Sequence, residues 1–331
     1  MLPDRDPRPI LVAPDKFKGT FTAAEVAAAV AAGLEAGGRA AEALPVADGG
    51  DGTAAALLAA LGGEAVAVAA TDALGREAEA AIALLADGRT AVVEVASASG
   101  LHRIAPDERD AEAATSAGTG ELLAAAVAAG ATRILVAAGG SATTDGGAGA
   151  IAALQAAGGP GAAELVVLSD VRTPFERAAA VFGPQKGADG DAVARLGRRL
   201  AAQARRLPRD PRGIPMTGAA GGLAGGLWAA FGATLAPGAP FVLDALGFDA
   251  RMRAAHAVIT GEGRLDESSL EGKALAEVAT RCRQAGVPCH AVVGQDGLDA
   301  FGHRLLDLQH VLEAQTLRRA RAAGAKLAER I

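Results

Sequence analysis

Polar residues gather in glycine-rich loops that follow short apolar runs, and their types suit anion binding, metal binding and proton transfer. The fullest loop follows the apolar run 134–136 and carries Gly139, Gly140, Ser141 and Asp145 ahead of an Ala/Ile/Leu-rich stretch. Glycine tolerates positive φ, and the backbone N–H groups of such a turn and of a helix N-terminus bind phosphate or carboxylate without a cationic side chain. This loop therefore predicts an anion site. The alternative is that Asp145 only caps the following helix.

Two loops nearer the N-terminus combine carboxylates with lysines or glycines. The run 10–13 leads into Pro-Asp-Lys-Phe-Lys-Gly-Thr, and the run 43–46 leads into Asp-Gly-Gly-Asp-Gly. Open α/β sheets bind ligands where their parallel strands end, and two carboxylates in a glycine loop suit Mg²⁺. The plainer alternatives are surface lysines and aspartates that cap helices. The candidates in these loops are Asp15, Lys18, Asp48, Gly49 and Gly50.

Later loops supply the remaining candidates. They lie in a Ser-Ala-Ser-Gly segment, after the run 165–168, in the stretch Val-Phe-Gly-Pro-Gln-Lys-Gly-Ala, and in Gly-Glu-Gly-Arg-Leu-Asp after the run 257–260. A dinucleotide-binding fingerprint would need Gly where Asp266 stands, and the sequence has no GxxxxGK[ST] P-loop. The candidates are Ser99, Asp170, Gln185, Lys186, Gly261, Glu262, Gly263 and Asp266.

The patterning of the chain changes twice, which predicts two domains. Strand, loop and helix units open the chain, alternating hairpin-like strands begin after Gly62-Gly63, and the opening pattern returns at 257–260. We predict a Rossmann-like parallel-sheet α/β domain from residues 1–65 and 255–331, interrupted by a second α/β domain with a mixed sheet at 66–254. We also expect a last small strand or turn near 241–243 in the inserted domain.

Composition excludes several function classes. The formal net charge of −6 argues against a nucleic-acid partner, whose phosphates require a basic face. The N-terminus has no apolar signal segment, and Gly or charge interrupts every long Ala-rich stretch, so we expect no membrane span. Cys282 and Cys289 lack metal-ligand spacing, and we expect reduced thiols in a cytoplasmic protein.

Six motifs in order resemble the bacterial glycerate kinase family. They are APDKFKGT (13–20), PVADGGDGT (45–53), AAGGSATTDGGAG (137–149), VFGPQKGA (181–188), GAAGGLAGGL (218–227) and ITGEGRLD (259–266). The resemblance covers nearly the whole chain and implies ATP- and Mg²⁺-dependent phosphorylation of D-glycerate on a two-domain α/β scaffold. The resemblance favours 2-phosphoglycerate as the product and implies that the reaction belongs to sugar-acid and glyoxylate catabolism. Members generally carry Ser and Asn where Lys16 and Thr144 stand here.

Phosphoryl transfer requires positioning, charge neutralisation and a base for the acceptor hydroxyl. We expect the glycine loops to hold phosphates, Lys18 and Lys186 to offset negative charge, and Asp170 to act as the base. Asp48 and Asp266 compete with Asp170 for the catalytic role and are the expected Mg²⁺ ligands. The protein is expected to be a monomer or homodimer.

Two other functions fit the same loops. One is a phosphosugar- or hydroxyacid-binding enzyme that is not a kinase, and the other is a catalytically silent metabolite sensor on the same fold. The joint presence of the ionisable candidates favours the enzyme, because a sensor needs the loops but not every charged group.

Overall fold

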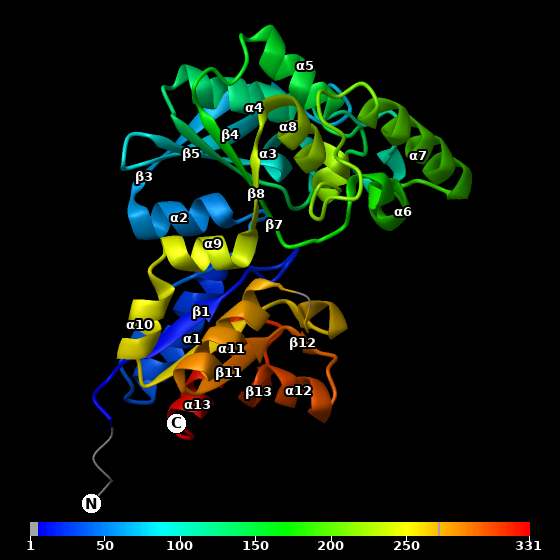
Figure 1. Cartoon of the computed structure of the whole chain (residues 1–331). Coiled ribbons are helices and arrows are strands. Elements are labelled where there is room, and N and C mark those ends of the chain that lie inside the picture. Colours follow the sequence, from blue (N-terminus) through cyan, green and yellow to red (C-terminus); the bar gives the residue numbers. More distant parts are fainter. Residues whose placement is uncertain (1–5, 271) are drawn as a thin grey trace, which may run out of the picture. The chain divides into compact units, whose positions relative to one another are not determined.

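The computed structural model of the chain describes residues 6–270 and 272–331. Its residues divide into two compact units. The first unit comprises the described residues up to Asp48 together with Ala239–Ile331, and the second comprises Gly49–Gly238. A five-stranded sheet organises the first unit and a six-stranded sheet organises the second (Figure 1).

The five-stranded sheet of the first unit is parallel throughout, in the order β13-β11-β9-β1-β2. Its strands come from both ends of the chain, which confirms the predicted Rossmann-like parallel sheet. A separate parallel pair joins β10 to β12. The elements of the unit are β1 (Ile10–Pro14), α1 (Ala23–Ala36), β2 (Ala41–Ala43), α9 (Gly238–Ala245), α10 (Phe248–Ala254), β9 (Ala257–Gly261), β10 (Arg264–Leu265), α11 (Ala274–Ala285), β11 (Cys289–Val293), β12 (Gln295–Asp296), α12 (Ala300–Leu306), β13 (Leu308–Glu313) and α13 (Leu317–Ala328).

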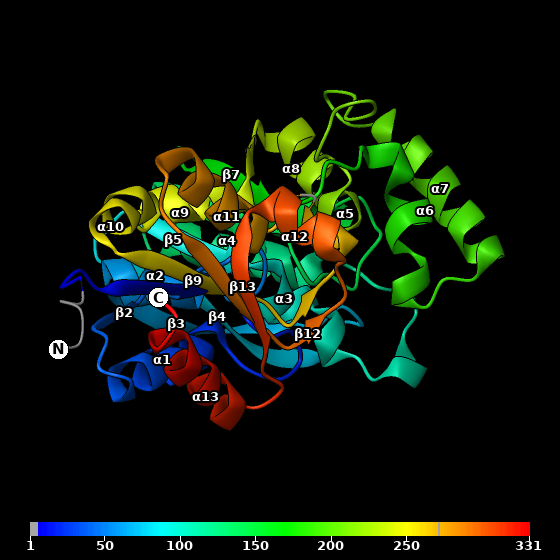
Figure 2. The same ribbon diagram turned by 90° about the horizontal axis from the view of Figure 1, so that it is seen from below.

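Helices α1 and α13 cover one face of this sheet, and α11 lies on the other (Figure 2). Two glycines allow α1 and α13 to pack backbone against backbone. A Cβ at Gly33 would lie 2.0 Å from Arg321 O, and one at Gly324 would lie 2.2 Å from Val30 O. Alanine at either position would force the helices apart, so these glycines serve packing.

The sheet of the second unit is mixed, in the order β3-β4-β5-β6-β7-β8. β3, β4 and β5 pair antiparallel, and β5 to β8 pair parallel, which confirms the predicted hairpin region and mixed sheet. The elements are α2 (Thr53–Leu61), β3 (Gly63–Thr71), β4 (Glu77–Leu85), β5 (Thr90–Glu94), α3 (Val95–Ser99), α4 (Ala117–Ala128), β6 (Arg133–Ala137), α5 (Ala148–Ala156), β7 (Glu164–Ser169), α6 (Ala178–Phe182), α7 (Gly190–Ala204), α8 (Leu223–Phe231) and β8 (Thr234–Pro237).

A buried aliphatic core holds α4, α5 and α8 against one face of the mixed sheet. Leu122, Leu154 and Leu227 come from these helices, and Ile134 and Val167 come from the strands, all fully buried. Small side chains let the layers approach closely, as expected for a core almost without aromatic residues. Because β5 to β8 run parallel, their carboxyl ends lie at one common edge of the sheet.

The first boundary between the units lies between residues 48 and 49, not after residue 65 as predicted. Helix α2 is the reason. Its buried side chains, Ala56 and Leu57, pack against β4 and β5, and Glu94 at the end of β5 binds the amides at its N-terminus. The helix therefore belongs with the mixed sheet, which the loop pattern before it does not reveal.

The second boundary lies between residues 238 and 239, not after residue 254. The expected strand or turn near 241–243 is wrong, because these residues form part of α9. Arg281 of α11 holds α9 and α10 in the first unit through Asp244 (2.6 Å) and Asp249 (3.2 Å). The last strand of the mixed sheet is instead β8, immediately before α9.

Two expectations from composition can be compared with the structure. No described helix combines the length and the apolar character that crossing a membrane requires. Cys282 on α11 and Cys289 on β11 are both buried free thiols. The hydrogen bond with the neighbouring Cys282, and after it burial, raise the pKa of the Cys289 thiol, so Cys289 is a poor nucleophile.

A buried histidine gives the first unit a predicted sensitivity to acid. His290 on β11 is fully buried and stacks on His310 with 5.2 Å between ring centroids. Neither ring nitrogen of His290 has a hydrogen-bond partner among the described residues. Burial, then His310 and His256, lower its pKa to about 4. Its neutral form is therefore the one that the folded protein stabilises.

We expect the free energy of unfolding to fall by up to roughly 3 kcal/mol as the pH drops from 6.5 to 4. The unfolded imidazole takes up its proton near its ordinary pKa, whereas the folded one stays neutral until about pH 4. The contribution of His290 to the free energy of unfolding is therefore complete above pH 6.5 and is lost progressively as the pH falls from there to about 4. Urea unfolding at several pH values should show a flatter profile for His290→Phe. The half-exposed, Asp296-paired His303 provides the control variant His303→Phe, and equal acid sensitivity in both variants would contradict the assignment.

Candidate active site

Three carboxylates follow neighbouring strand segments at one edge of the first unit. β1 pairs with β9 as far as Pro14 and Gly261, and Val46 N donates to Pro14 O at 3.0 Å. Asp15 N also donates to Gly261 O at 2.8 Å. Because these segments run side by side, their polar continuations emerge together. The carboxylates are Asp15, Asp48 and Glu262.

Burial and the neighbouring carboxylates both act on the charge of this carboxylate set. Burial, followed by the nearby Asp48, raises the pKa of Asp15 well above its usual value, although Lys16 N donates to Asp15 at 2.6 Å. Burial also raises the pKa of Glu262. The buried Oε1 of Glu262 has no hydrogen-bond partner among the described residues, and Lys273 Nζ lies 3.8 Å from its other oxygen. A cation would be stabilised at this edge.

The two glycines of the Gly-Glu-Gly loop are required by close backbone packing. A Cβ at Gly261 would lie 2.1 Å from Val292 O, and one at Gly263 would lie 3.0 Å from Lys18 N. The loop therefore sits directly against the segment that carries Lys18, whose side chain is exposed. The structure thus brings Lys18, Asp15 and Glu262 to one edge, as their positions after β1 and β9 indicate.

Asp266 has local partners that compete for its carboxylate. Its Oδ1 accepts hydrogen bonds from Ser268 N at 3.0 Å and Ser268 Oγ at 2.6 Å, and Arg264 Nε lies 3.1 Å from Oδ2. The Ser268 hydroxyl is the main cause that lowers the pKa of Asp266. Binding of a metal ion by Asp266 would have to displace these partners, so Glu262 is the better-placed oxygen ligand.

The loop after β6 in the second unit forms a tight turn with available backbone donors. Gly140 has φ +74°, and a Cβ at Gly139 would lie 2.6 Å from Gly50 Cα. Within the described ranges, the amides of residues 139–141 donate no hydrogen bond to another residue. The hydroxyl of Ser141 accepts from Thr143 N at 3.0 Å. Three adjacent N–H groups with no acceptor suit an anion.

Asp145 holds two helices together, as the capping alternative anticipated. Its carboxylate accepts four hydrogen bonds of 2.8–3.1 Å, from the amide and hydroxyl of Ser116 and from the amides of Gly147 and Gly149. These donors lie at the starts of α4 and α5. The N-terminus of α5 is thereby occupied by a carboxylate of the chain itself. A ligand anion fits the 139–141 turn better than this helix end.

Lys186 is buried close to the same loop. Its Nζ donates to Thr143 O at 2.5 Å and lies 5.9 Å from the centroid of the Phe182 ring. Burial lowers the pKa of Lys186 to about 7, and the charge of Asp145 partly opposes this shift. The lysine therefore changes charge near neutral pH. A buried amine of this kind is retained at a cost in stability, which is typical of functional sites.

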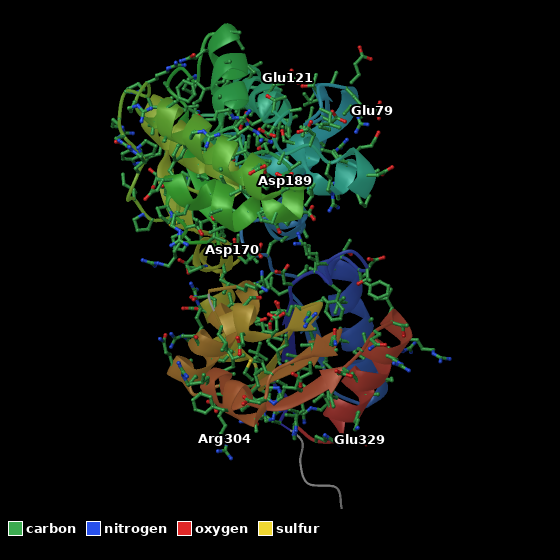
Figure 3. The ribbon with its side chains drawn as sticks, turned by 90° about the vertical axis from the view of Figure 1, so that its right-hand side faces the viewer. Glu79, Glu121, Asp170, Asp189, Arg304 and Glu329 are labelled. Atoms are coloured by element: carbon green, nitrogen blue, oxygen red, sulfur yellow. The ribbon has the colours of Figure 1, made fainter. Side chains whose placement is uncertain are left out.

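Asp170 directly follows β7 and is half-buried (Figure 3). Ala138 N donates to Leu168 O at 3.0 Å, so the end of β7 lies beside the chain that enters the 139–141 turn. A Cβ at Gly49 would lie 3.0 Å from Leu168 Cβ, which brings the start of the glycine loop at residues 49–52 to the same place. The sequence candidates of the second unit thus converge on the ends of β6 and β7.

Two predicted residues of this unit have other surroundings. Ser99 is fully buried, and its hydroxyl accepts from Thr119 Oγ1 at 2.9 Å. This bond ties the end of α3 to α4. Gln185 exposes its side chain to solvent next to the buried Lys186. Their predicted roles in substrate binding remain predictions.

Glu94 is a polar residue of this edge that sequence reasoning missed. It ends β5, and its Oε1 accepts from Gly52 N at 2.9 Å and Ala54 N at 2.8 Å. No local sequence pattern predicts this role. A capping carboxylate is normally predicted from its position within a few residues of the helix start, and Glu94 lies about forty residues from the helix that it caps. Its location at the end of a parallel strand was the available signal.

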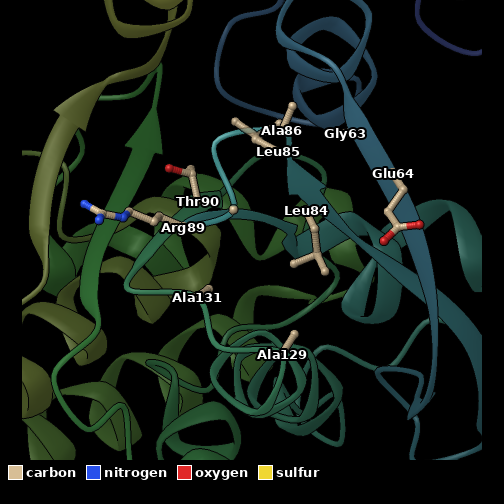
Figure 4. Close-up of a pocket in the computed structure, with 10 residues that line it drawn as sticks. Gly63, Glu64, Leu84, Leu85, Ala86, Arg89, Thr90, Ala129 and Ala131 are labelled. Carbon is tan, nitrogen blue, oxygen red and sulfur yellow. The ribbon is translucent and has the colours of Figure 1, made fainter.

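No group of three or more His, Cys, Asp or Glu side chains in the described parts of the chain has the arrangement of a metal site. A cavity of 410 Å³ lies elsewhere in the second unit, at the edge where β5 and β6 begin (Figure 4). Its lining includes Leu84, Arg89 and Ala129 and none of the predicted site residues. The candidate chemistry therefore stays at the edge where the parallel strands end.

Comparison with known proteins gives a consistent relationship. Residues 10–158 and 155–329 match the model of the glycerate kinase family. The glycerate kinase of Haemophilus influenzae is 36% identical over an alignment of 356 positions that covers 92% of this chain and 93% of that protein. The glycerate 2-kinase of Escherichia coli is 35% identical over an alignment of 338 positions that covers 88% of this chain and 89% of that protein.

A solved structure extends the match to the fold. The crystal structure of putative glycerate kinase 2 from Salmonella typhimurium LT2 superposes with a TM-score of 0.82 at 34% sequence identity, covering 98% of both chains. The glycerate kinase of Bacillus subtilis is 38% identical over an alignment of 328 positions that covers 88% of this chain and 86% of that protein. With its motifs, its two sheets and these relatives in agreement, the chain belongs to the glycerate kinase family.

Proposed function

We propose that this protein transfers the γ-phosphoryl group of ATP to a hydroxyl of D-glycerate, with 2-phosphoglycerate as the favoured product. The observation that carries the proposal is the turn at 139–141, whose three amides have no acceptor in the described chain and which lies beside the strand that delivers Asp170. Anionic substrates need such donors, and a hydroxyl acceptor needs a base within reach. Family membership supplies the identity of the substrate.

In this mechanism the 139–141 amides bind an anionic group of the reactants, and Asp170 accepts the proton of the attacking hydroxyl. The product is then a phosphate ester and ADP. Lys186, near Thr143 and Asp145, contributes positive charge to the loop that carries the turn. Lys18 is the corresponding exposed cation of the first unit. Positive charge and amide donors of this kind offset the negative charge of a phosphoryl group during its transfer.

ATP serves as phosphoryl donor in kinases generally, and we propose that Mg²⁺ accompanies it. The oxygen ligands of the first unit fit this ion, because Glu262 has a buried oxygen without a hydrogen-bond partner and Asp15 and Asp48 lie close by. Mg²⁺ typically takes one or two carboxylates together with phosphate and water, so a complete protein cage is not required. Bound there, the ion would neutralise phosphate charge. Asp266, the other predicted ligand, would have to give up Ser268.

The test is ADP release from the purified protein with a panel of three-carbon hydroxyacids, followed by ³¹P NMR of the product. We expect ADP formation that depends on D-glycerate, with a phosphate ester on the 2-hydroxyl. Turnover of a hydroxyacid without ATP would instead support the non-kinase enzyme. Glycerate binding by calorimetry without any ADP release would support the metabolite sensor. A 3-phosphoglycerate product would retain the kinase and overturn the regiochemistry.

A further inference from the structure

Glu94 makes a long-range contact with the loop that precedes α2. It is the last residue of β5, and its Oε1 accepts hydrogen bonds from Gly52 N (2.9 Å) and Ala54 N (2.8 Å). Hydrogen bonds from backbone amides to an ionised acceptor are about twice as strong as neutral ones. This single oxygen therefore fixes the loop to the end of the mixed sheet.

Helix α2 has no cap of its own. Its N-cap residue, Gly52, has φ +96° and no side chain to accept the amides of the first turn. Helix N-termini carry partial positive charge, which a carboxylate offsets. Glu94 supplies both the acceptor and the charge. The end of α2 is consequently occupied, as the end of α5 is by Asp145, and neither helix offers its N-terminus to a phosphate.

Further contacts link this loop to the proposed anion site at residues 139–141. Thr53 Oγ1 donates to Gly50 O at 2.6 Å, which ties the first turn of α2 to the glycine loop. A Cβ at Gly139 would lie 2.6 Å from Gly50 Cα, so the two loops touch backbone to backbone. A displacement of Gly50 would therefore be transmitted to the turn at 139–141.

We propose that Glu94 is a positioning residue for phosphoryl transfer: by holding the start of α2 it fixes the Gly49–Gly52 loop and, through Gly50, the amide turn at 139–141. This inference rests on the proposed function. In this role Glu94 acts through the loop and not on the reacting atoms. Its negative charge at the helix end is the property that matters, so a free carboxylate placed there restores the effect.

The first experiment uses Glu94→Ala. We expect kcat/KM for glycerate phosphorylation to fall about 10–100-fold, since a misplacement of around 1 Å in a binding element has effects of this size. Acetate or formate should restore activity saturably and raise the Tm of this variant, because either anion can occupy the vacated helix end. The Tm measurement needs no activity. Glu94→Gln, which keeps an acceptor oxygen without the charge, should lie between wild type and Glu94→Ala.

Glu121 provides a matched control in the same unit, well separated from Asp170 in Figure 3. Its carboxylate accepts from Thr71 N (2.6 Å) and Thr71 Oγ1, so Glu121→Ala removes a comparable contact on β3. We expect a similar loss of Tm in this variant, near-normal kcat/KM and no response to acetate. Equal kinetics in the two alanine variants, or Glu94→Ala that acetate neither stabilises nor reactivates, would overturn the inference. If the wild type is inactive but acetate still raises the Tm of Glu94→Ala, the proposed function is overturned, whereas the role of Glu94 in holding the start of α2 stands.

Discussion

Asp170→Asn is expected to lower kcat by about 10²–10⁴-fold while nucleotide binding stays near the wild-type level, because the amide keeps the shape of the side chain but cannot accept a proton. Asp170 directly follows β7, at the edge where the 139–141 turn also lies. Steady-state kinetics with saturating glycerate measure the loss, and calorimetry with ADP measures the retained binding. A lower kcat at unchanged affinity is the signature of a group that acts on the reacting hydroxyl.

Asp189 offers the control for this substitution. Its carboxylate caps α7 by accepting from Ala192 N at 2.7 Å, and asparagine is an equally good cap (Figure 3). Asp189→Asn should therefore leave both kcat and Tm near wild type. If Asp170→Asn keeps near-normal kcat, Asp170 is not the base, and Asp48 or Asp266 takes its place as the leading candidate.

Local signals predicted much of the fold because each can be recognised within a few residues. Thr22 and Glu25 have the three-residue spacing of a capping box in the sequence, and they form one at the start of α1. The apolar runs 10–13 and 257–260, each followed by a polar loop, lie in the strands β1 and β9. α9 was missed because Phe241–Leu243 is a short apolar run, which periodicity alone cannot assign to helix or strand.

The unit boundaries and several site roles could not be predicted, because they depend on contacts between distant positions. α2 joins the mixed sheet through its contacts with β4, β5 and Glu94. The sequence of α2 itself does not predict which sheet the helix packs against. Asp145 illustrates the same limit. Its spacing in the loop fits both ligand binding and capping, and only the positions of Ser116 and Gly149 show that its carboxylate is occupied.

The candidate residues themselves were predictable from one rule, which is that polar loops after parallel strands meet at one edge of a sheet. The rule brought Asp15 and Glu262 together in the first unit and the 139–141 turn and Asp170 together in the second. It does not say which oxygen binds a cation or which takes a proton, since that depends on burial and partners. The catalytic and metal-binding roles therefore remain predictions.

Lys186→Met is expected to lower kcat/KM by about 10²–10³-fold and at the same time to raise the free energy of unfolding by roughly 1–4 kcal/mol. The methionine side chain fills a similar volume without an ammonium group to desolvate, whereas burial holds the pKa of Lys186 near 7. Chemical denaturation and steady-state kinetics on the same preparation measure the two changes. Lys18 is exposed, so Lys18→Met should lower activity without a gain in stability. Full activity in both variants would show that neither charge serves the reaction.

The charge of Lys186 also predicts a pH profile. As the pH rises through about 7 the amine loses its proton, so kcat/KM should fall above that pH if the cation is the active form. The charged groups near Lys186 include Asp145, which favours the proton, and Arg199, whose guanidinium donates to Thr144 O at 3.3 Å. Arg109 Nη1 donates to Gln185 O at 3.5 Å. Lys186→Arg keeps its charge throughout, so the decline should move to higher pH in this variant. If kcat/KM of Lys186→Arg declines at the same alkaline pH as in the wild type, another group causes the decline. If Lys186→Met is also fully active, Lys186 has a purely structural role.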